Sequence, residues 1–312
     1  MALTVVGSIA FDSVRTPFGE RDRMLGGSTV HFSLAASFFT EVRVVGPVGD
    51  DFGDDDLAVL RDRGVITDDI ERISGGETFF WRAHYEYDMN VAHTDDTQLN
   101  VFADFDPKLS DAAKRSELLF LGNIDPELQR RVRASSEAEF AALDSMNFWL
   151  ESERDSLVAA IGEVDCLMLN DAEIRELTGE PNLARAARAA MGIGPGVIVA
   201  KRGEYGAALF SSEGLFAIPG YLLEDVQDPT GAGDCFAGGF LGYLDSRRAA
   251  GDSVRDPAVL RQAMAYGSVL ASFNVEDFGT DRIQRLTKDE IEARLRDLQQ
   301  ITRFGIETSP TN

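Results

Sequence analysis

The residues best suited to chemistry form one short run, Asp-Pro-Thr-Gly-Ala-Gly-Asp, at positions 228–234. Pro229 prevents a strand or helix from continuing through this run, while Gly231 and Gly233 permit tight backbone turns. Apolar residues then recur every four positions from 236 to 244, so a helix is predicted to begin at the end of the run. The free amide groups at such a helix start form a binding site for an anion, and phosphate is the expected anion.

The amides of Gly231, Ala232 and Gly233 are predicted to point outward at this helix start. Asp234 would lie in the first turn beside them, where its carboxylate could take a proton from a hydroxyl that attacks the bound phosphoryl group. A simpler interpretation also fits the residue types, because an aspartate in the first turn complements the helix dipole by about 0.3–1 kcal/mol.

Short apolar segments alternate with helix-period segments, which predicts a mostly parallel sheet covered by helices on both faces. The predicted strands are residues 3–6, 42–45, 118–121, 140–143, 166–169 and 197–200. The main helical patterns are residues 172–177, 183–191, 231–248, 256–274 and 287–301. In such sheets, ligands bind beyond the carboxyl ends of the strands, so the residues that follow each strand carry the site.

One aromatic segment, residues 78–87, interrupts this alternation. With residues 13–24 and a second extended stretch near 98–102, it predicts a small separate sheet that could act as a lid. Its aromatic side chains could stack on a nucleobase or cover a second subunit. We favour the second subunit, because alternation along a strand places them on opposite faces. These aromatic residues are Phe79, Phe80, Trp81, Tyr85 and Tyr87.

The composition excludes several classes of protein. Among 312 residues, 53 are acidic and 30 basic, and the net charge of -23 argues against a nucleic-acid partner. No apolar run approaches the roughly 20 residues needed to cross a membrane. With only two cysteines, Cys166 and Cys235, we expect a cytoplasmic protein without disulfides. The low lysine content fits either a salt-rich cytoplasm or an ordinary acidic protein.

Residues 228–241 resemble the C-terminal signature of the PfkB, or ribokinase-like, carbohydrate kinases, and other family features follow in order along nearly the whole chain. The resemblance implies a ribokinase-like α/β fold, a three-layer sandwich with a mostly parallel central sheet and a small β lid. It implies one domain over residues 1–312, with the lid formed by about residues 13–25 and 77–103. The implied activity is ATP-dependent phosphoryl transfer to a hydroxyl of a sugar or nucleoside, with Asp234 as general base.

The same resemblance indicates where the acceptor binds. Asp12 matches the substrate-side aspartate of the family, although an aspartate after a strand can also simply cap a loop. Gly26 and Gly27 match the glycine pair that approaches the substrate. His31 stands where the family has a substrate-binding asparagine; it could donate to a hydroxyl or be a packed helical histidine.

Two further segments resemble the nucleotide side of the family. Asn170 and Glu173 match an Asn-x-x-Glu motif tied to magnesium and phosphate, and one carboxylate suffices because magnesium keeps several waters. The alternative is an ordinary helix N-cap. Lys201, Gly203 and Gly206 match a turn that contacts the nucleotide, with a plain hairpin turn as the alternative.

The sequence therefore predicts an ATP- and magnesium-dependent kinase whose lid excludes water, and the resemblance also allows a monovalent cation and a homodimer formed through the lid. A second hypothesis is a non-catalytic sugar- or nucleotide-binding regulator on the same fold, which the intact Asp234 disfavours. A dinucleotide-dependent oxidoreductase would need Gly-x-Gly-x-x-Gly after the first strand, and residues 7–12 lack it. The acceptor stays open.

Overall fold

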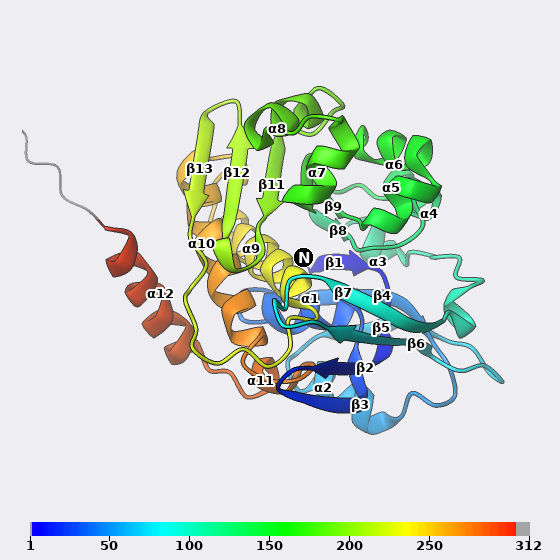
Figure 1. Ribbon diagram of the computed structural model, residues 1–312. Coiled ribbons are helices and arrows are strands. Elements are labelled where there is room, and N and C mark those ends of the chain that lie inside the picture. The colour runs from blue at the N-terminus through cyan, green and yellow to red at the C-terminus, as the bar shows by residue number, and fades with distance from the viewer. Residues whose placement is uncertain (1, 304–312) are drawn as a thin grey trace, which may run out of the picture.

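A nine-stranded sheet forms the centre of the computed structural model, which describes residues 2–303 (Figure 1). Its strand order is β13-β12-β11-β10-β9-β8-β1-β4-β5, and all neighbours are parallel except the pairs β11–β12 and β12–β13. The strands are β1 Leu3–Val6, β4 Val42–Val48, β5 Ile66–Arg72, β8 Leu118–Leu121, β9 Phe140–Asp144, β10 Cys166–Asn170, β11 Val197–Lys201, β12 Ala207–Ser211 and β13 Gly214–Ile218.

Helices cover both faces of this sheet, which confirms the predicted three-layer α/β fold. In β8, Leu118 and Phe120 pack into one apolar cluster while Leu119 and Leu121 pack into a second cluster on the opposite face. One helical layer contains α1 Ser28–Ala36, α2 Asp54–Arg61, α9 Ala232–Ala249, α10 Pro257–Asn274, α11 Asp281–Gln284 and α12 Lys288–Thr302. The other contains α3 Asp111–Lys114, α4 Pro126–Ser135, α5 Asn147–Ser152, α6 Arg154–Ile161, α7 Asp171–Thr178 and α8 Leu183–Met191.

A second, four-stranded sheet lies beside the first and is called the lid below (Figure 1). Its order is β3-β2-β6-β7, with β2 and β6 parallel and the other pairs antiparallel. The strands are β2 Ala10–Thr16, β3 Gly19–Gly26, β6 Phe79–Tyr85 and β7 Ala92–Gln98.

The prediction of an extended stretch near residues 98–102 is wrong, because β7 ends at Gln98 and Asn100–Phe102 forms a 3₁₀ turn. β7 has the sequence Ala-His-Thr-Asp-Asp-Thr-Gln and is mostly exposed. A strand of this kind carries no apolar alternation in its sequence.

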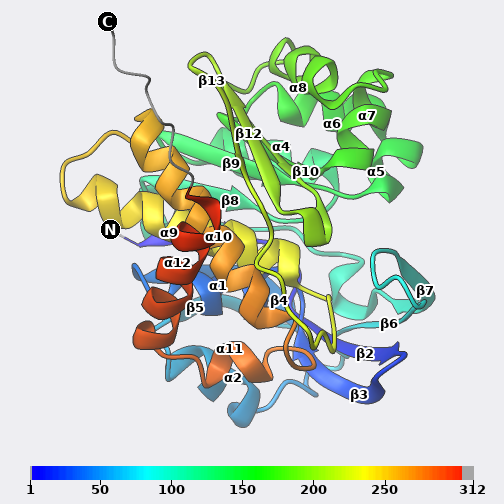
Figure 2. The same cartoon turned by 60° about the vertical axis from the view of Figure 1, so that its left-hand side comes forward.

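Helix α9 is held closely between α1 and α10, and Figure 2 shows the three together. A Cβ atom built on Gly238 would lie 2.3 Å from the carbonyl oxygen of Phe32 in α1. One on Gly239 would lie 3.0 Å from the Cα of Gly267 in α10. These two glycines therefore permit close contact between helix backbones, which offsets their unfavourable helix propensity of about 1 kcal/mol each. The packing fixes where the N-terminus of α9 lies.

Among the helices of residues 2–303, none combines the length and the apolar character that crossing a bilayer requires.

Candidate active site

A buried carboxylate shapes the turn that precedes α9. Asp228 is fully buried, and its Oδ1 accepts the backbone N–H of Thr230 at 2.9 Å. Its Oδ2 accepts the N–H of Gly279, 3.0 Å away, from the segment before α11. Gly231 follows with φ of 74°, a left-handed conformation that favours glycine. The turn is thus tied to a second segment of backbone before the helix begins.

The expectation of three free amides needs one correction. The N–H of Ala232 donates to the carbonyl oxygen of Pro229 at 3.2 Å, so it is used within the turn. Within residues 2–303, the N–H groups of Gly231 and Gly233 have no hydrogen-bond partner in the protein, and both residues are half-exposed. The helix start can therefore offer these two donors to an anion.

Asp234 lies in the first turn of α9, as predicted, and is partly buried. Burial of the carboxyl raises its pKa to about 8; the Asp144 carboxylate raises the pKa further, while the Lys201 ammonium lowers it. Because a low-dielectric environment disfavours the charged form, Asp234 in the free protein is mostly protonated at neutral pH. A carboxyl with such a pKa is well matched to proton transfer near neutral pH.

The His31 side chain packs against this turn from helix α1. Its side chain is only 1% exposed, and its Nδ1 lies 3.0 Å from Oδ1 of Asn274. The Nδ2 of Asn274 donates to the carbonyl oxygen of Thr230 at 2.7 Å, so Oδ1 is free to accept and Nδ1 of the histidine is the donor. Burial lowers the pKa of His31 to about 4, which keeps the ring neutral.

This geometry differs from the expectation that His31 donates to a substrate hydroxyl. The Nδ1 proton is used by Asn274, and Nε2 is an unprotonated acceptor that is shielded from solvent and has no partner within residues 2–303. A Cβ atom on Gly231 would lie 2.3 Å from the imidazole ring, so the ring packs directly against the turn. The packed-histidine alternative therefore describes this conformation better.

Asp12, in β2 of the lid, lies next to the two glycines expected on the substrate side. A Cβ atom on Gly26 would lie 2.0 Å from the Asp12 Oδ2, and Gly27, the N-cap of α1, has φ of 90°. Burial raises the pKa of Asp12 to about 7, although a hydrogen bond from the Gly27 amide opposes the increase and the charge of Asp228 adds to it. The charges of Asp12 and Asp234 also repel each other. Each carboxylate therefore makes ionisation of the other less favourable.

The lid directly contacts the turn that precedes α9. The hydroxyl of Tyr85 in β6 lies 3.1 Å from Oγ1 of Thr230. Asp12 is paired with Trp81 in the register of β2 and β6, and residues alternate between faces along a strand. Trp81 and Tyr85 therefore lie on the same face of the lid as Asp12.

Lys201 at the end of β11 approaches the turn from the large sheet. Its Nζ lies 2.5 Å from Oδ2 of Asp144, and a Cβ atom on Gly233 would lie 3.2 Å from the same Nζ. Sequence reasoning missed Asp144, which ends β9. The one available signal was an acidic residue at the carboxyl end of a parallel strand, where ligands gather.

Asn170 and Glu173 form the capping box that the simpler interpretation allowed. Oδ1 of Asn170 accepts the N–H of Glu173 at 2.8 Å, and Oε2 of Glu173 accepts the N–H of Asn170 at 2.9 Å. Glu173 is buried, which raises its pKa to about 7; Lys201 lowers this pKa and Asp144 raises it. Oε2 of Glu173 is used in the capping box, so Oε1 is the oxygen that remains to coordinate a magnesium ion. Residues 2–303 hold no cluster of three His, Cys, Asp or Glu side chains suited to a metal.

Gly203 and Gly206 shape the turn between β11 and β12. Their φ angles are 54° and 87°, and the N–H of Arg202 donates to the carbonyl oxygen of Gly206 at 2.8 Å. A Cβ atom on Gly206 would lie 2.1 Å from the carbonyl oxygen of Ile218 in β13. The turn thus has a clear structural role at the edge of the sheet.

Known proteins similar to this chain are kinases. Residues 23–285 match the model of the pfkB family carbohydrate kinases. The cytidine kinase of Thermococcus kodakarensis is 28% identical over 255 residues, which cover 78% of this chain and 89% of the relative.

Two solved structures show the same fold. A putative ribokinase II of E. coli, in complex with ATP and Mg²⁺, has a TM-score of 0.77 and 19% identity and covers 95% of this chain and 99% of that one. The nucleoside kinase of Burkholderia thailandensis, in complex with inosine, has a TM-score of 0.75 and 19% identity, with 95% and 97% covered. At such identity these structures establish the ribokinase fold.

The packing of His31 against Gly231 predicts a specific loss of stability. Gly231→Ala adds a strained left-handed residue, which costs roughly 1–2 kcal/mol, and forces its Cβ into the imidazole, which costs about 1–3 kcal/mol more. Gly64→Ala is the matched control, because Gly64 has φ of 73° and nothing within 4 Å of its Cβ position. Urea unfolding should show a clearly larger loss for Gly231→Ala, and equal losses would contradict the contact with His31.

Proposed function

This chain belongs to the pfkB family of carbohydrate kinases, which are phosphotransferases with an alcohol group as acceptor. From this premise we propose that it transfers the γ-phosphoryl group of ATP to a hydroxyl of a nucleoside or sugar. We propose Asp234 as the general base. The observation that supports this role best is the arrangement at the start of α9. Asp234 lies beside two amides that have no partner among the described residues, and the Lys201 ammonium lies against the same turn. Phosphoryl transfer depends mainly on positioning, charge stabilisation and a base.

In the proposed reaction, the acceptor oxygen forms a bond to the γ-phosphorus while the bond from that phosphorus to the β,γ-bridging oxygen breaks. The hydroxyl proton passes to Asp234, and ADP leaves with the bridging oxygen. The amides of Gly231 and Gly233 donate to the oxygens of the transferring group, where negative charge must be stabilised. Magnesium would supply further positive charge to the reaction, and Oε1 of Glu173 would help to hold it.

The nucleotide would extend from the turn over Asn170 and along the hairpin of Lys201, Gly203 and Gly206. Support for this path comes from the shared edge of the sheet, since Asn170 and Lys201 are register partners at the carboxyl ends of β10 and β11. The monovalent cation that the resemblance allows stays a prediction, and in the turn itself both oxygens of Asp228 accept backbone N–H groups.

We propose a nucleoside as the acceptor in preference to a free sugar. The Asp12 carboxylate can accept two hydroxyl groups of a ribose ring. Trp81 and Tyr85 lie on the same face of the lid, where an aromatic ring could stack on a base. The relatives that are named cytidine kinase and nucleoside kinase favour the same class. His31 would act beneath the Gly231 turn, as a support, and not on the acceptor itself.

The proposal predicts turnover that depends on Asp234. With ATP and magnesium, the protein should phosphorylate cytidine or inosine faster than ribose. Asp234→Asn should lower kcat by about 10²–10⁴-fold, because the base is lost, while calorimetry should show nearly unchanged binding of ADP. The matched control is Asp225→Asn, an exposed aspartate in the preceding loop, which should keep full turnover.

Near-normal turnover by Asp234→Asn would exclude this residue as the base. Tight nucleoside binding with no product from the unmodified protein would favour the non-catalytic regulator.

The raised pKa of Asp234 predicts the pH dependence. The base must be unprotonated, so kcat/KM should increase about tenfold per pH unit below a midpoint near 8 and become constant above it. In Lys201→Met the midpoint should move to higher pH, because the ammonium that lowers the pKa of Asp234 is gone. Lys201 is not among the groups that act on Asp12, so the movement distinguishes the two carboxyls. A flat profile between pH 6 and pH 8 would contradict the assignment.

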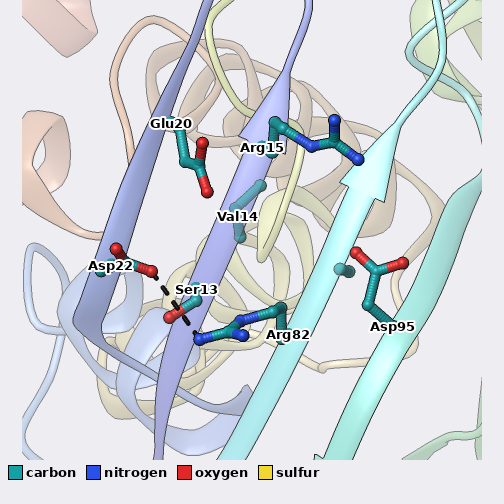
Figure 3. Close-up of a pocket in the computed structure, with 8 residues that line it drawn as sticks. Ser13, Val14, Arg15, Glu20, Asp22, Arg82 and Asp95 are labelled. Carbon is teal, nitrogen blue, oxygen red and sulfur yellow. Dashed lines mark ion pairs between the residues drawn. The ribbon is translucent and has the colours of Figure 1, made fainter.

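We propose that the outer face of the lid binds a second copy of the chain. A hollow of about 460 Å³ lies on this face, and Figure 3 shows the side chains that line it. Two arginines and three acidic side chains surround it, so a two-fold axis could bring each arginine onto a carboxylate of the partner. These residues are Arg15, Arg82, Glu20, Asp22 and Asp95.

We thus propose a charged dimer face in place of the aromatic one that the sequence predicted. Phe79 stacks on Phe102, with ring centroids 5.4 Å apart, and the guanidinium of Arg82 lies 5.5 Å from the ring of Phe80. Large apolar side chains are exposed in the turns that join the lid strands, at Phe18, Tyr87 and Val91.

Sedimentation should show a dimer at micromolar protein concentration. Arg15→Glu combined with Arg82→Glu should give a monomer, because the arginines would then repel the carboxylates of the partner. High salt should weaken the unmodified dimer, since salt screens exposed charges. Arg131→Glu, on α4 away from the lid, is the control and should stay dimeric. A monomeric unmodified protein, or an unchanged double variant, would exclude this interface.

A further inference from the structure

The ion pair of Lys201 and Asp144 crosses the end of a strand. β10 lies between β9 and β11, with Asn170 paired to Lys201 and Met168 paired to Asp144. The lysine side chain therefore reaches over β10 to a carboxylate two strands away, where Nζ and Oδ2 are 2.5 Å apart. Both side chains are largely buried, at 18% and 8% exposure. A contact of this length fixes where the ammonium lies.

The surroundings of this ammonium contain more negative than positive charge. Asp144, Glu173 and Asp234 all act on Lys201 and raise its pKa, against the effect of burial. A buried ammonium needs a counter-charge, and three carboxyls compete for this one. Lysine has a flexible stem, so the position of its charge depends on which carboxyl holds it.

The position matters because Asp234 is one of the competitors. If the Lys201 ammonium paired with Asp234 instead, it would neutralise the charge of the base. The ammonium would also lose its place beside Gly233. The short contact with Asp144 keeps it beside the turn, with Nζ 3.2 Å from the place of a Cβ on Gly233. There it lies against Gly233, whose amide is free within the described residues.

We infer that Asp144 is a positioning residue for phosphoryl transfer, which holds the Lys201 ammonium against the amide turn and away from Asp234. The inference rests on the proposed kinase function. Lys201 then meets the oxygens of the transferring group beside Gly233. A fixed positive charge is most effective where charge develops in the transition state, because no reorganisation is needed during the reaction.

The alternative role of the pair is to stabilise the fold, and the chain contains a matched example. Arg43 and Asp69 form an ion pair of similar burial, with side-chain exposures of 13% and 5%, between β4 and β5 at the far end of the sheet. Removing one member of either buried pair leaves the other unpaired, so both changes should lower stability. Only Asp144 should affect catalysis.

The test compares Asp144→Asn, Asp144→Glu, Lys201→Met and the double variant Asp144→Asn/Lys201→Met, with cytidine as acceptor. Asp144→Asn should lower kcat by about 10–100-fold, less than the roughly 10²–10³-fold expected for loss of a direct donor, because Asp144 acts through Lys201, and change the KM for cytidine less than about threefold. Asp144→Glu should restore part of kcat, since a carboxylate is still present. The double variant should match Lys201→Met alone, because residues that act as a unit are not additive.

Asp69→Asn should lower the unfolding midpoint in urea to a similar extent as Asp144→Asn and leave kcat unchanged. The inference is overturned if Asp144→Asn keeps full kcat, or if its decrease in kcat only reflects a smaller folded fraction. It is also overturned if the decrease in kcat of the double variant equals the product of the decreases of the two single variants. Failure of the unmodified protein to phosphorylate any nucleoside would reject the proposed acceptor class separately. The same variants are then compared in ATP hydrolysis without an acceptor, where an unchanged rate in Asp144→Asn would also overturn the inference.

Discussion

The geometry of the site depends on how the turn before α9 is held. The buried carboxylate of Asp228 ties this turn to the backbone of Gly279, and the relay from His31 through Asn274 ends on the carbonyl oxygen of Thr230. A buried carboxylate is costly unless its oxygens accept hydrogen bonds, and here backbone N–H groups satisfy both. The turn is therefore fixed from two directions before a ligand arrives. Free amides held in this way can stabilise developing charge without reorganisation.

Several buried carboxyl groups lie around this turn, shielded from solvent. Burial raises the pKa values of Asp12, Glu173 and Asp234 to about 7, 7 and 8. Each carboxyl makes the ionisation of its neighbours harder, and the Lys201 ammonium opposes this effect. Such a site has a deficit of positive charge, which suits a substrate that arrives with a divalent cation. Such surroundings also bring the pKa of a carboxyl, which is normally a weak base, close to neutral pH.

The lid separates its two faces by the alternation of strand residues. The inner face brings Asp12, Trp81 and Tyr85 toward the turn, and Tyr85 contacts Thr230 directly. The outer face carries Arg15 and Arg82 among acidic side chains (Figure 3). The same short strands thus present one surface to the turn before α9 and another of different chemistry to the outside, because neighbouring residues point in opposite directions.

The sequence by itself determined the six central strands, the main helices and the position of Asp234 at a helix start, because apolar periodicity, Pro and Gly carry that information locally. β5 and β7 gave no such signal, since edge strands with polar sequences need not alternate. Only the tertiary structure decided that Asp144 meets Lys201, that His31 packs beneath Gly231, and that the Ala232 amide is used inside the turn. Each of these depends on contacts between distant segments, such as residues 57 positions apart for the ion pair. The identity of a residue limits which bonds it can make, but packing decides which partner is within reach.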